Sequence, residues 1–136
     1  MENFKKILVG YNDSPQSKAA LELAGQLARL SKAHLIIVIS MEGGSREKLK
    51  DIENARESLD EALRLMSTKG ITCEVHQTAR GLPPGEDLVA YAKENQVDVI
   101  AVGVKKKSKA QKIILGSTAQ HIILNAPCPV LTVKSL

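Results

Sequence analysis

Short apolar runs alternate with longer amphipathic stretches along the whole chain, and this alternation limits the possible folds more than any other feature. The apolar runs at residues 5–11, 33–40 and 97–103 are continuous, which is typical of strands covered on both faces. Residues 15–31 and 46–68 instead place apolar side chains at helical spacing. The pattern therefore predicts an α/β fold, a parallel sheet with helices on both faces.

Capping and helix-breaking residues set several element boundaries. Ser14 followed by Pro15 is typical of a helix start, a capping side chain and then proline at the first helical position. Gly70 is expected to end the helix at 46–68. The more polar segment at 72–78 is predicted to be a strand at a sheet edge. The remaining elements are expected at residues 81–85 (turn), 86–94 (helix), 105–112 (basic loop), 116–125 (helix) and 130–134 (strand), within a single domain over residues 1–136.

The composition argues against several classes of protein. Aromatic residues make up 2% of the chain and Trp is absent, which disfavours a surface that stacks single-stranded nucleic acid. Cys73 and Cys128 lie far apart without a CxxC motif, so neither a disulfide framework nor a zinc site is expected. We see no membrane-spanning apolar run and no signal peptide, and expect a cytoplasmic protein. The net charge of +4 suits an anionic ligand, but on charge alone an ordinary lysine-rich surface is the favoured interpretation.

In an open α/β sheet, ligands bind beyond the carboxyl ends of the strands, where the strand order reverses. The loops to consider are therefore residues 11–15 and 103–118. The second loop contains no acid and ends in Gly116-Ser117-Thr118 at a predicted helix start. Its lysines are Lys105, Lys106, Lys107, Lys109 and Lys112.

This second loop has two interpretations. A helix N-terminus offers free N–H groups and partial positive charge, so phosphate could bind there beside Gly116, with hydroxyls of Ser117 and Thr118 as further donors. Alternatively, Gly-Ser-Thr is only a helix start and the lysines are a solvated loop. The position at the reversal of strand order favours phosphate. Neither GxxxxGK[ST] nor GxGxxG is present, so a Walker-type NTPase and a dinucleotide-binding domain are not expected.

Gly103 and Gly116-Ser117 stand at the spacing of the nucleotide-binding signature of the universal stress protein family. The chain resembles that family over essentially its whole length. The segment AQHIILNAPCPVLTVK is similar to the family's usual ending, and KKILVGYNDSPQSKAALELA to its first strand and helix. The resemblance implies a five-stranded sheet of order 3-2-1-4-5 and a homodimer. It also implies ATP or AMP at the ends of strands 1 and 4, with Mg²⁺ held through the phosphates.

Carried over to this sequence, the resemblance assigns the phosphates to the glycines and to Ser117 and Thr118, and the base to Ser40 through its backbone. Two positions depart from the family pattern. Lys106 stands at the second signature glycine, and Asn12, followed by Asp13, stands where an acid holds the ribose. The nucleotide-binding residues expected are Tyr11, Asn12, Asp13, Ile39, Ser40, Met41, Gly103, Lys105, Lys106, Gly116, Ser117 and Thr118.

The last strand is predicted to be a sheet edge that pairs with a second copy of the chain, because an apolar edge has unpaired backbone groups. The alternative is a covered edge in a monomer. The dimer-interface residues expected are Val130, Leu131, Thr132 and Val133.

Three functions remain open from the sequence. The first is a nucleotide-binding stress sensor or regulator, and the second a dimeric interaction protein without nucleotide, motivated by Lys106 and Asn12. The third is an enzyme, at most a slow ATPase, for which we assign no catalytic and no metal-ligating residues. The three histidines, His34, His76 and His121, are isolated in the sequence.

Overall fold

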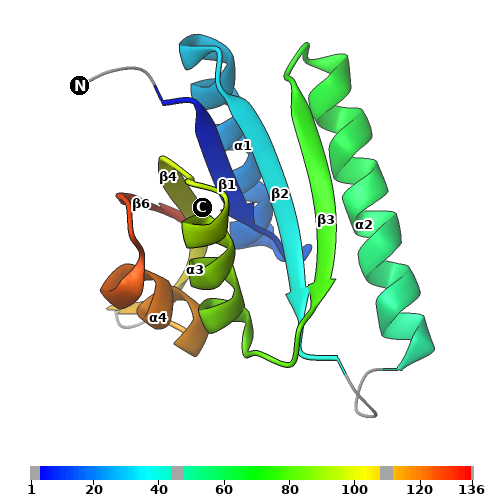
Figure 1. Cartoon of the computed structure of the whole chain (residues 1–136), viewed down its shortest axis with the longest axis vertical. Coiled ribbons are helices and arrows are strands. Elements are labelled where there is room, and N and C mark those ends of the chain that lie inside the picture. Colours follow the sequence, from blue (N-terminus) through cyan, green and yellow to red (C-terminus); the bar gives the residue numbers. More distant parts are fainter. Residues whose placement is uncertain (1–3, 44–47, 108–111, 136) are drawn as a thin grey trace.

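The computed structural model describes residues 4–43, 48–107 and 112–135 (Figure 1). Strand β1 pairs in parallel with β2 and with β4, β2 pairs with β3, and β4 pairs with β6. The five parallel strands therefore follow the expected order 3-2-1-4-5, with β6 as the fifth. The elements are β1 (Lys6–Gly10), α1 (Pro15–Ser31), β2 (His34–Met41), α2 (Leu49–Thr68), β3 (Cys73–Ala79), α3 (Pro84–Glu94), β4 (Val99–Lys107), β5 (Lys112–Ile114), α4 (Ser117–Asn125) and β6 (Val130–Lys134).

Helices cover both faces of the sheet, α1 and α2 on one side and α3 and α4 on the other (Figure 1). Successive residues of β1 show why its apolar run is continuous. Ile7 and Val9 pack into the cluster with α1 and α2, whereas Leu8 packs into the cluster with α3 and α4. All three side chains are fully buried. None of the described helices is long and apolar enough to span a membrane.

Most element boundaries agree with the sequence analysis. The helix at 15–31 and the strand at 130–134 have the predicted bounds, and β3 lies at the edge of the sheet. Helix α2 begins at Leu49, and part of the predicted start, residues 46 and 47, lies outside the described residues. Helix α3 begins at Pro84, within the predicted turn, because proline fits the first helical position.

The basic loop expected at residues 105–112 is wrong at residues 105–107 and 112, which lie in strands, while residues 108–111 lie outside the described residues. Strand β4 continues to Lys107, and its end pairs antiparallel with β5 in the register Lys105↔Ile114, Lys106↔Ile113 and Lys107↔Lys112. The β-branched Ile113 and Ile114 favour an extended backbone, which suits pairing with the end of β4. Lys105, Lys106, Lys107 and Lys112 therefore lie in paired strands that extend the sheet beyond its parallel part.

Strand β4 and the first turn of α1 approach very closely at Gly103. A Cβ atom at this position would lie 2.4 Å from the carbonyl carbon and oxygen of Gln16 and 2.7 Å from the backbone nitrogen of Ser17. These atoms belong to helix backbone, so no side-chain rotation relieves the overlap. Gly103 is thus required by packing, whereas a Cβ at Gly116 would have no heavy atom within 4 Å.

Gly103→Ala should lower the free energy of unfolding by about 1–3 kcal/mol or more, because the added methyl group forces β4 and α1 apart. The matched control is Gly116→Ala, which adds the same methyl group in open space at an ordinary φ of −66°. It should change stability by less than about 1 kcal/mol. Denaturant unfolding of both variants measures the difference, and equal stabilities would contradict this account of Gly103.

Candidate functional site

A cavity of about 420 Å³ opens at the carboxyl ends of β1 and β4, between the N-termini of α1 and α4. It lies where the strand order reverses, as the sequence analysis expected for a ligand. Of the residues predicted to bind nucleotide, Tyr11, Asn12, Ile39, Ser40, Gly103, Lys105, Gly116, Ser117 and Thr118 line this cavity.

One end of this first cavity suits an anion. The N-cap of α4 is Gly116, which has no side chain to cap the first N–H groups of the helix. Ser117 and Thr118 follow it, and the exposed Lys105 lies on the same cavity wall. Among its described lining residues there is no Asp or Glu. The local charge is therefore positive and unopposed.

A second cavity of about 570 Å³ adjoins the first and shares Asn12, Ile39, Ser40 and Pro84 with it. Its wall carries three acids, Asp13, Glu42 and Asp51. The predicted residues Asp13 and Met41 lie here rather than in the first cavity. The two cavities together form one site with a basic end, an acidic end and a shared wall between them.

Lys106 is the one predicted residue whose side chain cannot be placed in this site. Its backbone belongs to β4 and pairs with Ile113, so the chain is extended at the position of the second signature glycine. The Lys106 side chain lies outside the described residues. The prediction that Lys106 binds the nucleotide therefore stays a prediction.

In the turn after β1, the side-chain oxygen of Asn12 is occupied by hydrogen bonds from within the turn. The Asn12 Oδ1 atom accepts hydrogen bonds from the backbone N–H of Ser14 at 3.1 Å and from the Ser14 hydroxyl at 2.5 Å. Both lone pairs of this oxygen are thus used within the turn. Asp13 has a positive φ of 63°, a conformation that Asp tolerates, and its carboxylate lies 3.4 Å from the Lys18 ammonium.

Tyr11 contributes to the site mainly as a packed residue. Its side chain belongs to the buried cluster with α1 and α2, and its hydroxyl lies 3.5 Å from Asp13 Oδ1. Burial, with the nearby negative charge of Asp13, raises the pKa of Tyr11 to about 12. The hydroxyl is therefore neutral at physiological pH.

A buried carboxylate, Asp87 on α3, holds the shared wall of the two cavities, and the sequence analysis missed it. Its Oδ2 accepts hydrogen bonds from the hydroxyls of Ser40 at 2.5 Å and Thr78 at 2.6 Å, and its Oδ1 from Arg80 Nε at 2.7 Å. The side chain is only 1% exposed. In sequence, Asp87 looks like an exposed acid in the first turn of a helix, which the helix dipole favours, so the signal was weak.

Opposing effects act on the ionisation of Asp87. Burial favours the neutral acid, but the hydrogen bonds from Ser40, Thr78 and Arg80 and the charge of Arg80 together hold the pKa below its ordinary value of 3.8. The ion pair with Arg80 extends to the exposed Glu94, whose Oε1 lies 2.7 Å from Arg80 Nη1. Asp87 is therefore ionised at neutral pH and fully paired.

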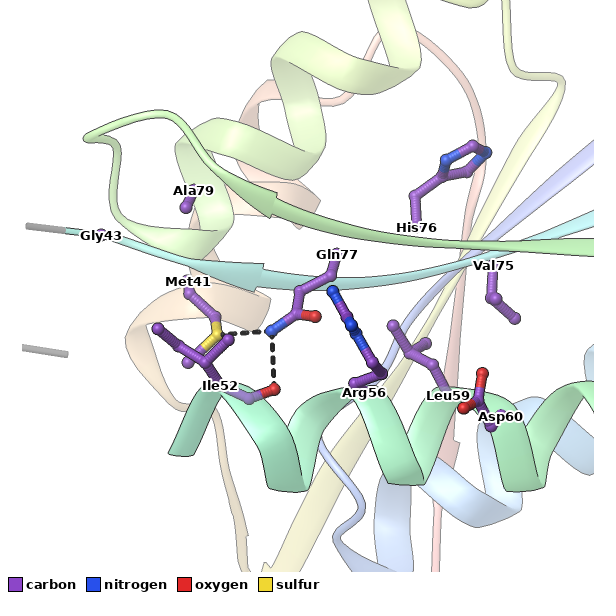
Figure 2. A pocket seen from close by; sticks show the side chains of 10 residues that line it. All are labelled: Met41, Gly43, Ile52, Arg56, Leu59, Asp60, Val75, His76, Gln77 and Ala79. Atoms are coloured by element: carbon purple, nitrogen blue, oxygen red, sulfur yellow. Dashed lines mark hydrogen bonds between the residues drawn. The ribbon is translucent and has the colours of Figure 1, made fainter. Parts of the chain in front are cut away.

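A further cavity of about 600 Å³ lies between α2 and the edge strand β3 (Figure 2). Between β3 and α2, Gln77 Nε2 donates to Met41 Sδ at 3.2 Å and to the Ile52 carbonyl at 3.1 Å. The two charged side chains on its α2 wall, Arg56 and Asp60, belong to exposed residues. Of the predicted site residues, it contains only Met41.

Two of the histidines are not isolated in space. His34 and His76 each place Nε2 beside the Glu74 carboxylate, at 3.2 and 3.3 Å. His34 reaches it from the adjacent strand β2, whereas His76 lies on β3 with Glu74. His121 lies on α4, with its Nδ1 3.4 Å from Asn125 Nδ2. Within the part of the chain that the structure describes, no three His, Cys, Asp or Glu side chains are arranged to hold a metal ion.

Comparison with known proteins gives one consistent result. The family model described as "Universal stress protein family" matches residues 3–134. A universal stress protein of Thermus aquaticus is 30% identical, with 96% of this chain and 99% of the relative covered. A solved universal stress protein of Archaeoglobus fulgidus is 33% identical with a TM-score of 0.87, covering 96% of this chain and 98% of the other. A second one from this organism, solved in complex with dAMP, is 29% identical with a TM-score of 0.80, covering 98% and 100%.

The ionised Asp87 network should make stability depend on pH. Because the pKa of Asp87 is lower in the fold than its ordinary value of 3.8, its stabilisation is complete above that value and is lost as the pH falls below it. The free energy of unfolding should therefore decline by up to about 1.4 kcal/mol per pH unit in this range. Denaturant titrations from about pH 6 to about pH 3 should show a flatter profile for Asp87→Asn. Asp60→Asn, which alters an exposed acid, is the control, and an unchanged slope in Asp87→Asn would refute the assignment.

Proposed function

The chain belongs to the universal stress protein family, and we propose that it binds an adenine nucleotide at the carboxyl ends of β1 and β4. The observation that carries this proposal is the polarity of the site. A cavity with a bare helix N-terminus and Lys105, and no described acid, adjoins a second cavity with three acids. A nucleotide has the same polarity, anionic phosphates at one end and hydroxyl and amino donors at the other.

The phosphates are assigned to the first cavity. The uncapped N–H groups at the start of α4 would donate to phosphate oxygens, together with the hydroxyls of Ser117 and Thr118. Lys105 would supply the balancing charge. Any Mg²⁺ would be held by the phosphates of ATP themselves, since this cavity has no carboxylate among its described lining residues.

The ribose is assigned to Asp13 instead of Asn12. The side-chain amide oxygen of Asn12, Oδ1, already accepts two hydrogen bonds from Ser14, so it has no lone pair left for a ribose hydroxyl. The Asp13 carboxylate lines the second cavity and is half exposed. A charged acceptor there also restores the charge-assisted bond that asparagine would lack.

We propose that the protein acts by holding the nucleotide, as a sensor or regulator in stress physiology, rather than by hydrolysing it. Efficient hydrolysis needs a group that positions water at the γ-phosphate. The described lining of the first cavity has no Asp, Glu or His for this purpose. The dAMP complex of the similar Archaeoglobus fulgidus protein supports binding of the adenine class.

Isothermal titration should detect binding of AMP and ATP to the wild-type protein. Gly116→Val should weaken both by tenfold or more, because the added side chain occupies the approach of the phosphates to α4. The substitution adds its atoms where the protein leaves open space, so thermal unfolding should stay close to wild type. No heat at about millimolar ligand, or equal affinity in Gly116→Val, would contradict the proposal.

We also propose a two-fold dimer through β6, which pairs with β4 on one side only among the described strands. Leu131 and Val133 are half-buried on this strand. On the neighbouring helix α4, Leu124 is 80% exposed and Ile123 is 41% exposed. An apolar edge of this kind is stabilised by pairing with a second copy.

Thr132→Lys should shift the protein from dimer to monomer in sedimentation experiments, because two like charges would face each other across the two-fold axis. Thr132 is exposed, so the fold of each copy should be retained. The same substitution at Thr72, beside the opposite edge of the sheet, is the control and should leave the dimer intact. A monomeric wild type would overturn the dimer proposal.

A further inference from the structure

Ser40 lies where its side chain could distinguish one nucleotide base from another. It lies near the end of β2, it is half-buried, and it lines both cavities, on the wall that they share. If the phosphates lie at α4 and the ribose at Asp13, the base lies beyond the ribose in the second cavity, which Ser40 also lines. The inference below therefore rests on the proposed nucleotide site.

The hydroxyl of Ser40 is held in one direction by Asp87. The two oxygens, Ser40 Oγ and Asp87 Oδ2, are 2.5 Å apart, and Asp87 is 1% exposed. The same carboxylate also receives the Thr78 hydroxyl and Arg80 Nε, and Arg80 Nη2 reaches the Asp87 carbonyl at 3.3 Å. Asp87 thereby ties the ends of β2 and β3 to α3, and it is surrounded by donors.

The chemistry of the groups fixes which of them gives the proton. An ionised carboxylate accepts hydrogen bonds and donates none, and the guanidinium of Arg80 beside Asp87 keeps it ionised. Ser40 must therefore donate its single hydroxyl proton to Asp87. Ser40 Oγ then has only lone pairs left for any further partner.

We propose that Asp87 is a positioning residue that fixes Ser40 as a hydrogen-bond acceptor, so that Ser40 selects a purine with an amino group at position 6. The amino group donates to Ser40 Oγ. A 6-oxo purine would instead present a carbonyl oxygen to an oxygen that has no proton to give, and both acceptors would be left unpaired. The site thus distinguishes adenine from hypoxanthine nucleotides through a carboxylate that does not touch the base.

AMP and IMP are the probes, because they share the ribose and phosphate and differ in the six-position group and the protonation of N1. Isothermal titration of the wild-type protein should give a preference for AMP of about tenfold or more. Ser40→Ala removes the selecting oxygen and should reduce the preference to about threefold or less. Asp87→Asn places an amide N–H donor against Ser40, which frees the hydroxyl proton for the cavity, so the preference should disappear or reverse.

Thr78→Val is the matched control, because it removes another hydroxyl from the same Asp87 oxygen and leaves the Ser40 bond in place. It should weaken the fold without changing the ratio of AMP to IMP affinity. A purely structural role for Asp87 would lower both affinities together, so the ratio separates the two roles. If Asp87→Asn fails to fold, the ratio in Ser40→Ala still decides the question.

The titrations test nucleotide binding and the selectivity role of Ser40 and Asp87 separately. If neither AMP nor IMP binds the wild-type protein, the proposed nucleotide-binding function is contradicted. AMP binding with an AMP-to-IMP preference near one, or a preference that survives Ser40→Ala, would leave the nucleotide site standing and overturn the role of Asp87 and Ser40.

Discussion

The close approach of β4 to the first turn of α1 is the constraint on which the site depends. At Gly103 the strand backbone lies where a Cβ would be 2.4 Å from helix backbone atoms, a separation that only glycine permits. This contact brings the start of α1 to the strand end that leads, through the paired strands β4 and β5, to α4. The cavity between the two helix N-termini follows from that packing, before any ligand is considered.

Charge is then distributed unevenly across the carboxyl edge of the sheet. The β4 side has Lys105 and an uncapped helix, and the β2 side has Asp13, Glu42 and Asp51. Asp87 ties the ends of β2 and β3 to α3 and fixes the hydroxyl of Ser40. Burying a carboxylate is costly unless it is fully hydrogen-bonded, so this network is specific to one arrangement of β2, β3 and α3. The same bonds that stabilise the fold there also set the hydrogen-bonding character of the shared wall.

The sequence predicted those features that local pattern determines. Continuous apolar runs identified the parallel strands, Ser14-Pro15 the start of α1, and the carboxyl ends of strands the position of the cavity. It failed where contacts join distant segments. Ser40 and Asp87 are 47 residues apart, and Gly103 meets α1 across most of the chain. A local contact was missed as well, because Asn12 loses its acceptor to the nearby Ser14 through a turn geometry that composition does not specify. The lysine run looked like a loop because strand pairing between β4 and β5 depends on the partner segment.

A nucleotide bound between α4 and the end of β2 is the central claim. Amide chemical-shift mapping during titration with AMP tests this claim residue by residue. The largest changes are predicted at Ser117, Thr118 and Ala119, together with Ser40, while the groove between α2 and β3 stays unchanged. Changes confined to that groove, around Val75 and Gln77, would contradict the account.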